Sequence, residues 1–213
     1  MRVLEGHESP LFSAAFDGKG RRLVTTTARW SSPRAVGPRK TLSSDNTARI
    51  WDLETGKCIV LRHDRGLAKA MFSPDGRRVL TQVGHAGTSP RPVRIWDPAT
   101  GDHLFSLSGR ESGLVFADFS TDGRQIVTLS RESSISVWDT QSGHLLLSFP
   151  LTKPSCFAKF CANNQEILTI GADGKTHLWP LDPLAAALVR KPRELTPEEC
   201  SMYGVDQPYT NAR

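Results

Sequence analysis

The chain has 213 residues, of which 38% are hydrophobic and 23% charged, a composition typical of a globular protein. No apolar run approaches the ~18 residues of a membrane span, and the first ten residues lack the apolar core of a secretory signal, so we expect neither a membrane protein nor an exported one. The four cysteines form no C-x-x-C pair, which argues against a disulfide framework or a zinc knuckle and favours a reducing cytoplasm: Cys58, Cys156, Cys161 and Cys200.

An internal repeat organises the chain as far as about residue 182. Four tryptophans, 41 to 45 residues apart, each follow an alternating strand pattern: Trp51, Trp96, Trp138 and Trp179. Before each of them lies a phenylalanine with alanine two residues earlier and threonine nine residues later: Phe16, Phe72, Phe119 and Phe160. Glycine or asparagine four residues after each Phe is typical of a tight hairpin. This pattern predicts an all-β fold, and in the third unit it places strands at about 113–119, 125–129, 134–139 and 144–149.

The motifs of this repeat are recognisable. FSPDG (72–76), FSTDG (119–123), DNTARIWDLETG (45–56) and VRIWDPATG (93–101) resemble those of WD-repeat β-propellers. The resemblance implies four-stranded antiparallel blades around a channel. We expect four blades, at about 1–62, 63–108, 109–149 and 150–182. Such propellers usually have more than four blades, so three explanations are open. The chain is a fragment of a longer protein, it pairs with another copy or chain to complete a ring, or it forms an unusually short propeller.

The same resemblance implies a hydrogen-bonded tetrad within each blade, made of a His, a Ser or Thr, an Asp and the repeat Trp. The first unit is complete and the others lack one or two members: His7, Thr25, Asp45, Trp51; His63, Thr81, Trp96; Thr128, Trp138; Thr169, Asp173, Trp179. The family uses these residues to satisfy buried polar groups, and no G-x-S-x-G elbow accompanies them. We therefore interpret the tetrads as structural and predict no catalytic residue.

Two insertions, 28–44 and 84–92, interrupt the repeat between the second and third strands of the first two units. Both are rich in Pro, Gly and Ser, which predicts loops. Their cations account for the whole formal net charge of +5: Arg29, Arg34, Arg39, Lys40 and Arg91. Trp30 lies among them. In the family such loops share one rim, so we expect these residues to bind an acidic or phosphorylated protein segment. Solvated loops without a partner are the alternative.

Residues 183–213 depart from the repeat. The sequence TPEE at 196–199 is a capping box with Pro at the first helical position, and it predicts a short helix at about 197–203. The segment RELTPEECSMYG resembles the end of large bacterial WD-repeat signalling proteins. A helix that caps the last blade is the simpler interpretation, and the two are compatible.

The sequence thus predicts a cytoplasmic, non-catalytic scaffold that docks a protein on its loop rim, and the tail resemblance would make it the docking part of a bacterial signalling protein. Nucleic-acid or phospholigand binding through the basic insertions is an alternative, and a propeller enzyme is a third. The few local cations, without an aromatic stacking platform, argue against nucleic acid. No metal-ligand or nucleotide-binding motif is present, so no metal or cofactor is predicted. Self-association could complete the ring.

Overall fold

The computed structural model describes residues 3–27, 45–64, 66–83, 92–108, 113–151, 154–161, 163–172 and 174–182. By its internal contacts the chain divides into Met1–Trp179 and Pro180–Arg213, and the arrangement given below is that of the first unit. The described residues form strands and turns, and none of them belongs to a helix that could cross a membrane. The predicted all-β fold is confirmed, whereas the helix predicted at about 197–203 lies outside the described residues.

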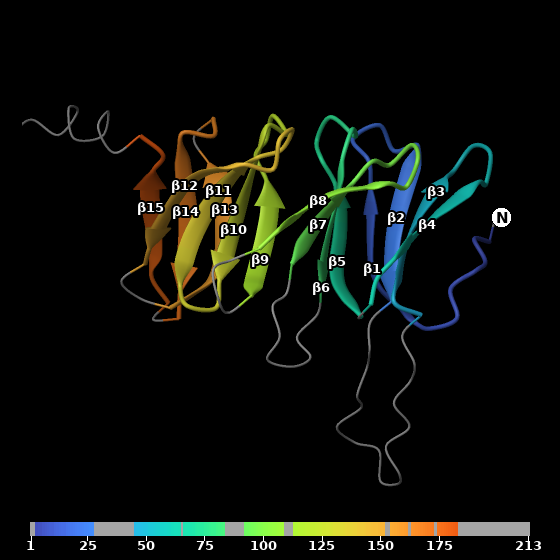
Figure 1. The fold of residues 1–213 in the computed structure, drawn as a ribbon, viewed down its shortest axis with the longest axis horizontal. Helices are drawn as coiled ribbons and strands as arrows, with labels where there is room; N and C mark the ends of the chain where they lie inside the picture. Colours follow the sequence, from blue (N-terminus) through green and yellow to red (C-terminus); the bar gives the residue numbers. More distant parts are fainter. Residues whose placement is uncertain are drawn as a thin grey trace, which may run out of the picture. The chain divides into compact units, whose positions relative to one another are not determined.

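Within these ranges, fifteen strands form four antiparallel sheets, each made of consecutive strands (Figure 1). Sheet 1 contains β1 (Leu11–Phe16), β2 (Arg22–Thr27), β3 (Thr47–Asp52) and β4 (Cys58–Arg62). Sheet 2 contains β5 (Leu67–Phe72), β6 (Val79–Val83), β7 (Val93–Trp96) and β8 (His103–Leu107). Sheet 3 contains β9 (Leu114–Phe119), β10 (Gln125–Ser130), β11 (Ser134–Asp139) and β12 (Leu145–Pro150). Sheet 4 contains β13 (Ser155–Cys161), β14 (Glu166–Gly171) and β15 (Thr176–Pro180).

Strand positions follow the repeat closely. β9 to β12 begin and end within one residue of the ranges expected from the sequence. The turns between the first and second strands have left-handed residues at the expected position, with φ of 65°, 70°, 72° and 66°: Gly20, Gly76, Gly123 and Asn164. By the spacing of the third repeat, a fourth strand of sheet 4 would follow Asp182, outside the described residues.

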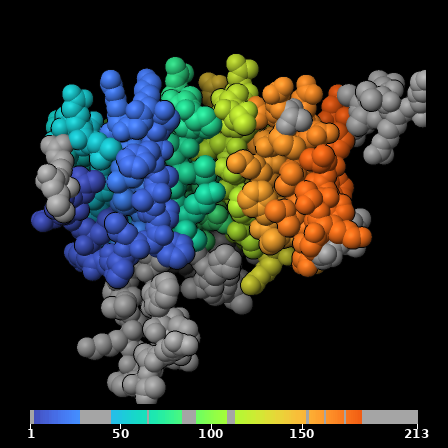
Figure 2. All heavy atoms as spheres, turned by 180° about the vertical axis from the view of Figure 1, so that it is seen from behind, coloured from blue at the N-terminus to red at the C-terminus, as the bar shows by residue number. Residues whose placement is uncertain are grey.

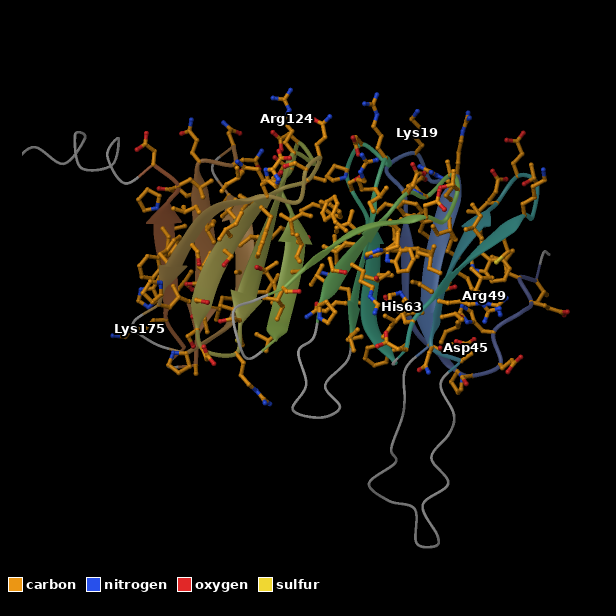
Figure 3. All side chains as sticks on the ribbon, viewed as in Figure 1. Lys19, Asp45, Arg49, His63, Arg124 and Lys175 are labelled. Atoms are coloured by element: carbon orange, nitrogen blue, oxygen red, sulfur yellow. The ribbon has the colours of Figure 1, made fainter. Side chains whose placement is uncertain are left out.

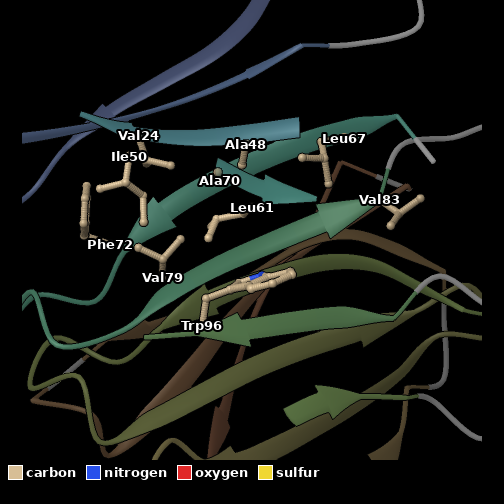
Figure 4. Packing of buried hydrophobic residues seen from close by; sticks show 10 residues of the cluster. All are labelled: Val24, Ala48, Ile50, Leu61, Leu67, Ala70, Phe72, Val79, Val83 and Trp96. Atoms are coloured by element: carbon tan, nitrogen blue, oxygen red, sulfur yellow. The ribbon is translucent and has the colours of Figure 1, made fainter. Parts of the chain in front are cut away.

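The core lies between successive sheets. In the first interface, one face of sheet 1 packs against one face of sheet 2 (Figure 4). We call the first of these faces trailing and the second leading. The trailing face of sheet 1 includes Val24, Ala48, Ile50 and Leu61, and the leading face of sheet 2 includes Leu67, Ala70, Phe72 and Val79. The second interface repeats this arrangement, with Leu80, Val93, Ile95 and Leu107 packed against Leu114, Ala117, Phe119 and Ile126.

Turns of neighbouring sheets are also bonded to each other. The Arg22 guanidinium donates to the backbone oxygen of Gly76 at 2.6 Å and lies 5.0 Å from the centre of the Phe72 ring. The hydroxyl and the backbone N–H of Thr121 both donate to Asn164 Oδ1 at 2.9 Å. Figure 2 shows the sheets following one another in chain order, from blue to orange. Each described sheet is therefore held by the one before it or the one after it, through both the core and the turns.

Candidate functional site

Every sheet contains a hydrogen-bonded Trp–Thr pair at the same repeat position. The indole Nε1 of each repeat Trp donates to a Thr Oγ1 at 2.8 or 2.9 Å, in the pairs Trp51–Thr25, Trp96–Thr81, Trp138–Thr128 and Trp179–Thr169. All four threonines are buried. Because an unpaired indole N–H or hydroxyl is costly to bury, each pair satisfies two groups at once.

In sheet 1 this pair extends into a longer chain of hydrogen bonds. His7 Nε2 lies 2.8 Å from Thr25 Oγ1, and His7 Nδ1 lies 2.8 Å from Asp45 Oδ2. Since Thr25 Oγ1 accepts from Trp51, its own hydrogen is available to His7 Nε2. The Nδ1–H of the imidazole then points at the carboxylate, which gives one continuous direction of donation from Trp51 to Asp45.

Asp45 also joins the ends of two strands. Its Oδ1 accepts from the hydroxyl of Thr27, the last residue of β2, and from the hydroxyl and N–H of Thr47, the first residue of β3. Burial alone would raise the pKa of Asp45, but the hydrogen bonds from Thr27, His7 and Thr47 outweigh it and hold this pKa far below its ordinary value. The ionised carboxylate therefore joins the end of β2 to the start of β3, the two points where residues 28–44 leave and rejoin sheet 1.

The equivalent position in sheet 2 has different chemistry, because the sequence has no aspartate there. Arg94 donates to Asp64 Oδ1 at 2.7 Å and lies 3.4 Å from His63 Nδ1. His63 Nε2 is buried, and none of the described residues forms a hydrogen bond with it. Burial and the adjacent Arg94 charge lower the pKa of His63 to about 3, so its ring is neutral at physiological pH.

In sheet 3, serines form the contacts at the corresponding edge. Ser130 and Ser134 bond to each other through their hydroxyls at 2.8 Å, and Ser130 Oγ also accepts from the N–H of Ser134. In sheet 4 the Trp179 ring lies 5.7 Å from that of Phe149 of sheet 3. Asp173, the remaining predicted tetrad residue, lies outside the described residues.

The Asp45–His7–Thr25 arrangement has the residue types of a hydrolytic triad. A cavity of about 430 Å³ adjoins it, lined by residues 4–7 and 9–11 and by Leu23, Thr25 and Trp51. However, the Thr25 side chain is buried at 3% exposure, and its hydroxyl is already engaged by the indole N–H of Trp51 and by His7, so it is poorly placed to attack a substrate. Among the described residues, no group of three His, Cys, Asp or Glu side chains could hold a metal ion.

The six residues predicted to bind a partner all lie outside the described residues: Arg29, Trp30, Arg34, Arg39, Lys40 and Arg91. The points of attachment of their two segments are described. β2 and β6 end, and β3 and β7 begin, along one rim of the sheets (Figure 1). Figure 3 shows Asp45 near this rim and Lys19 and Arg124 on the opposite rim.

That opposite rim carries a second group of cations that the charge count in the sequence missed. Four exposed side chains occupy the turns after β1, β5 and β9: Lys19, Arg21, Arg77 and Arg124. The five cations of the insertions equal the whole net charge of +5. The cations of the turns do not show in the net charge, because aspartates in the same and other turns balance them. The signal was present, since a basic residue follows the Gly in each of these turns.

Comparison with known proteins gives a consistent set of similarities. The family model described as "WD domain, G-beta repeat" matches residues 1–52 and 101–139. Autophagy-related protein 16 of Arabidopsis thaliana is 25% identical over 174 residues, covering 79% of this chain and 33% of that protein. Eukaryotic translation initiation factor 3 subunit I of Schizosaccharomyces pombe is 28% identical over 182 residues, covering 68% and 55%. Target of rapamycin complex subunit LST8 of Saccharomyces cerevisiae is 24% identical over 126 residues, covering 59% and 41%.

The chain thus spans about a third to about half the length of these curated relatives. Two of the three are named as subunits of larger assemblies. All three come from eukaryotes, and they do not bear on the resemblance of residues 183–213 to bacterial proteins, which stays a prediction.

Proposed function

We propose that the chain is a WD-repeat protein and that it acts as a non-catalytic scaffold, which docks a protein on the rim from which its two insertions project. Similar proteins that are named as complex subunits support a role in protein assembly. The buried and occupied hydroxyl of Thr25 supports the absence of catalysis at the one triad-like set in the described residues.

The observation that carries this proposal is the set of hydrogen bonds to Asp45 at the base of the first insertion. Thr27 and Thr47 both donate to Asp45, so the two ends of residues 28–44 are fixed to each other and to sheet 1. His7 holds the other carboxylate oxygen at 2.8 Å. A segment whose ends are fixed loses less conformational freedom on binding than one on a mobile base. Sheet 1 therefore provides a fixed base from which residues 28–44 can bind a partner.

The chemistry of the insertions indicates the kind of partner. Residues 28–44 contain four cations and no acid until Asp45 is reached, and residues 84–91 add Arg91. Arginines pair with carboxylates and phosphates through two parallel hydrogen bonds, and tryptophan is a frequent interface anchor. We propose an acidic or phosphorylated protein segment as the ligand, with Trp30 packed against its apolar part.

Binding of a fluorescent deca-glutamate peptide tests this proposal, with the same peptide carrying phosphoserines as a second probe. Replacing Arg29, Arg34, Arg39 and Lys40 by Gln should weaken binding at least tenfold, because it removes the proposed contacts. The matched control replaces four cations of the opposite rim by Gln and should change the affinity less than twofold: Lys19, Arg21, Arg77 and Arg124. Both variants lose four charges, so they differ in location alone.

Equal weakening by the two variants would mean general electrostatic attraction without a docking site, and the proposal would then be wrong. Tighter binding of a single-stranded oligonucleotide, lost in the insertion variant only, would favour the nucleic-acid alternative. Trp30→Ala should weaken peptide binding without changing its salt dependence, since this side chain contributes no charge.

A further inference from the structure

Sheets 1 and 4 each have one face on which large apolar side chains are exposed and which no other described strand covers. In the interfaces between successive sheets, the leading-face phenylalanines Phe72, Phe119 and Phe160 are 6%, 5% and 3% exposed. Phe16 occupies the same repeat position in sheet 1 and is 63% exposed. Its neighbours on this face, Leu11 and Ala14, are exposed as well, although Leu67 and Ala70 at the equivalent positions of sheet 2 are buried.

Sheet 4 has the opposite face uncovered. Leu178 occupies the repeat position of Ile50 and Ile95 on the trailing face, and it is 57% exposed where they are 2% and 0%. Ile170 is 38% exposed, whereas Leu129, at the equivalent position of sheet 3, is fully buried. Large exposed apolar side chains that gather on one face are typical of an interaction surface.

These two faces are the two halves of one kind of interface. Sheet 1 presents a leading face, with the Leu, Ala and Phe that sheets 2 and 3 bury against the sheet before them. Sheet 4 presents a trailing face, with Leu178 at the position that Ile50 and Ile95 occupy in the cores between sheets 1 and 2 and between sheets 2 and 3. The internal interfaces therefore show directly how a leading face and a trailing face fit together.

We infer that a second copy of the chain covers both faces, with the leading face of sheet 1 of each copy packed on the trailing face of sheet 4 of the other. Both halves belong to one polypeptide, so any second copy brings the complement of each. Two four-sheet units would make an eight-sheet ring, within the usual range of four to eight blades. Such a head-to-tail contact closes after two copies and leaves no apolar face open.

A like-to-like dimer does not fit these faces. It would place Phe16 against Phe16, and the hydrophobic cores between sheets 1 and 2 and between sheets 2 and 3 each join a trailing face to a leading face. The inference concerns the end faces and not the insertion rim, so it stands or falls independently of the docking function.

Sedimentation velocity of the chain across a concentration series tests the inference, starting from the 23.4 kDa of one copy. We expect a monomer–dimer equilibrium. Phe16→Glu and Leu178→Glu should each abolish the dimer, because each places a charge in both contacts of the closed pair. Both side chains are already more than half exposed in one copy, so neither change should unfold it, which circular dichroism checks. Leu146→Glu is the matched control: Leu146 is 53% exposed on β12, away from both faces, and this variant should dimerise normally.

A mixture of the two variants that do not dimerise on their own, Phe16→Glu and Leu178→Glu, gives the decisive result. The intact trailing face of the Phe16→Glu chain can still bind the intact leading face of the Leu178→Glu chain. An equimolar mixture should therefore form a dimer, weaker than that of the unmodified chain and unable to grow further. A dimer that survives Leu178→Glu, or a mixture that stays monomeric, would show that the contact is not head-to-tail and would overturn the inference. An unmodified chain that is monomeric at every concentration would also overturn it and would assign the two faces to sheets of another polypeptide.

Discussion

His7 and His63 occupy equivalent positions in sheets 1 and 2 but have opposite surroundings. His7 is bonded to Thr25 and Asp45, so both of its ring nitrogens have partners. His63 faces the guanidinium of Arg94, and its buried Nε2 has no hydrogen-bond partner in the part of the chain that the structure describes. The loss of one carboxylate between the two repeats thus changes a bonded histidine into one that must remain neutral.

The low pKa of His63 predicts a loss of stability in mild acid. This pKa falls from 6.5 to about 3 on folding, mainly through burial and then through Arg94. Between these values the unfolded chain binds a proton that the folded chain does not, so the free energy of unfolding decreases as the pH is lowered through this window. The expected contribution is on the order of 2–3 kcal/mol between pH 7 and pH 4.5. Urea denaturation at several pH values measures it.

His63→Gln should flatten this pH dependence, because it removes the titrating group. His144→Gln, which removes an exposed histidine, should leave the slope as it is in the unmodified chain. If His63→Gln and the unmodified chain lose stability equally between pH 7 and pH 4.5, His63 is not the group responsible.

At the residue scale, the sequence predicts what lies at a fixed repeat spacing. Thr and Trp of each pair come from neighbouring strands whose register the repeat sets, as in the pairing of Thr25 with Arg49 and of Leu23 with Trp51. The environment of His63 could not be predicted in this way. It depends on Arg94 reaching Asp64, which lies 30 residues earlier in the chain. The six insertion residues stay a prediction, because a repeat carries no information about segments that interrupt it.

At the scale of the elements, glycine turns have two distinct roles. Gly143, in the turn between β11 and β12, has a φ of +72°, and a Cβ built on it would lie 2.7 to 3.0 Å from three atoms of the Phe105 ring in sheet 2. Gly20, in the turn between β1 and β2, has a φ of +65° and open space around it. The first turn therefore needs glycine for both its backbone and its close approach to the neighbouring sheet, and the second needs it for its backbone alone.

Alanine substitutions separate these two roles. Gly20→Ala should cost about 1 kcal/mol of unfolding free energy, the usual penalty for a left-handed alanine. Gly143→Ala should cost about 2–4 kcal/mol, because the Phe105 ring must also move. Chemical denaturation of both variants measures the difference. Equal losses would mean that Phe105 moves away freely and that the turn does not fix the distance between sheets 2 and 3.

The repeat predicts strands and turns well, but it does not predict irregularities within the strands. The first strand of every sheet has a bulge at the same place, four residues before the repeat Phe: Phe12, Ala68, Val115 and Cys156. These four positions share no residue type, so no sequence signal marks them. The bulge is set by how the strand twists against its neighbour.

At the scale of the whole first unit, stability is expected to vary along the series of sheets. Sheets 2 and 3 are covered on both faces, whereas sheets 1 and 4 each have one face that no other described strand covers. In a protein whose units contact only their neighbours, the terminal units open more readily than the central ones. The sequence predicted four units and an incomplete ring. It could not predict how far each face is exposed, because Phe16 and Phe72 are identical in their repeat context.

Amide hydrogen exchange detected by mass spectrometry tests this gradient. In dilute solution, amides of β6 and β10 should exchange at least tenfold more slowly than those of β2 and β14, since local opening of the end sheets exposes less apolar surface. Raising the protein concentration should slow exchange in β2 and β14 and leave β6 and β10 unchanged, because association covers only the end faces. The Phe16→Glu variant provides the control, as its exchange should not depend on concentration. Uniform exchange rates across all four sheets would instead mean that the unit opens in a single cooperative step, and the nearest-neighbour description would then be wrong.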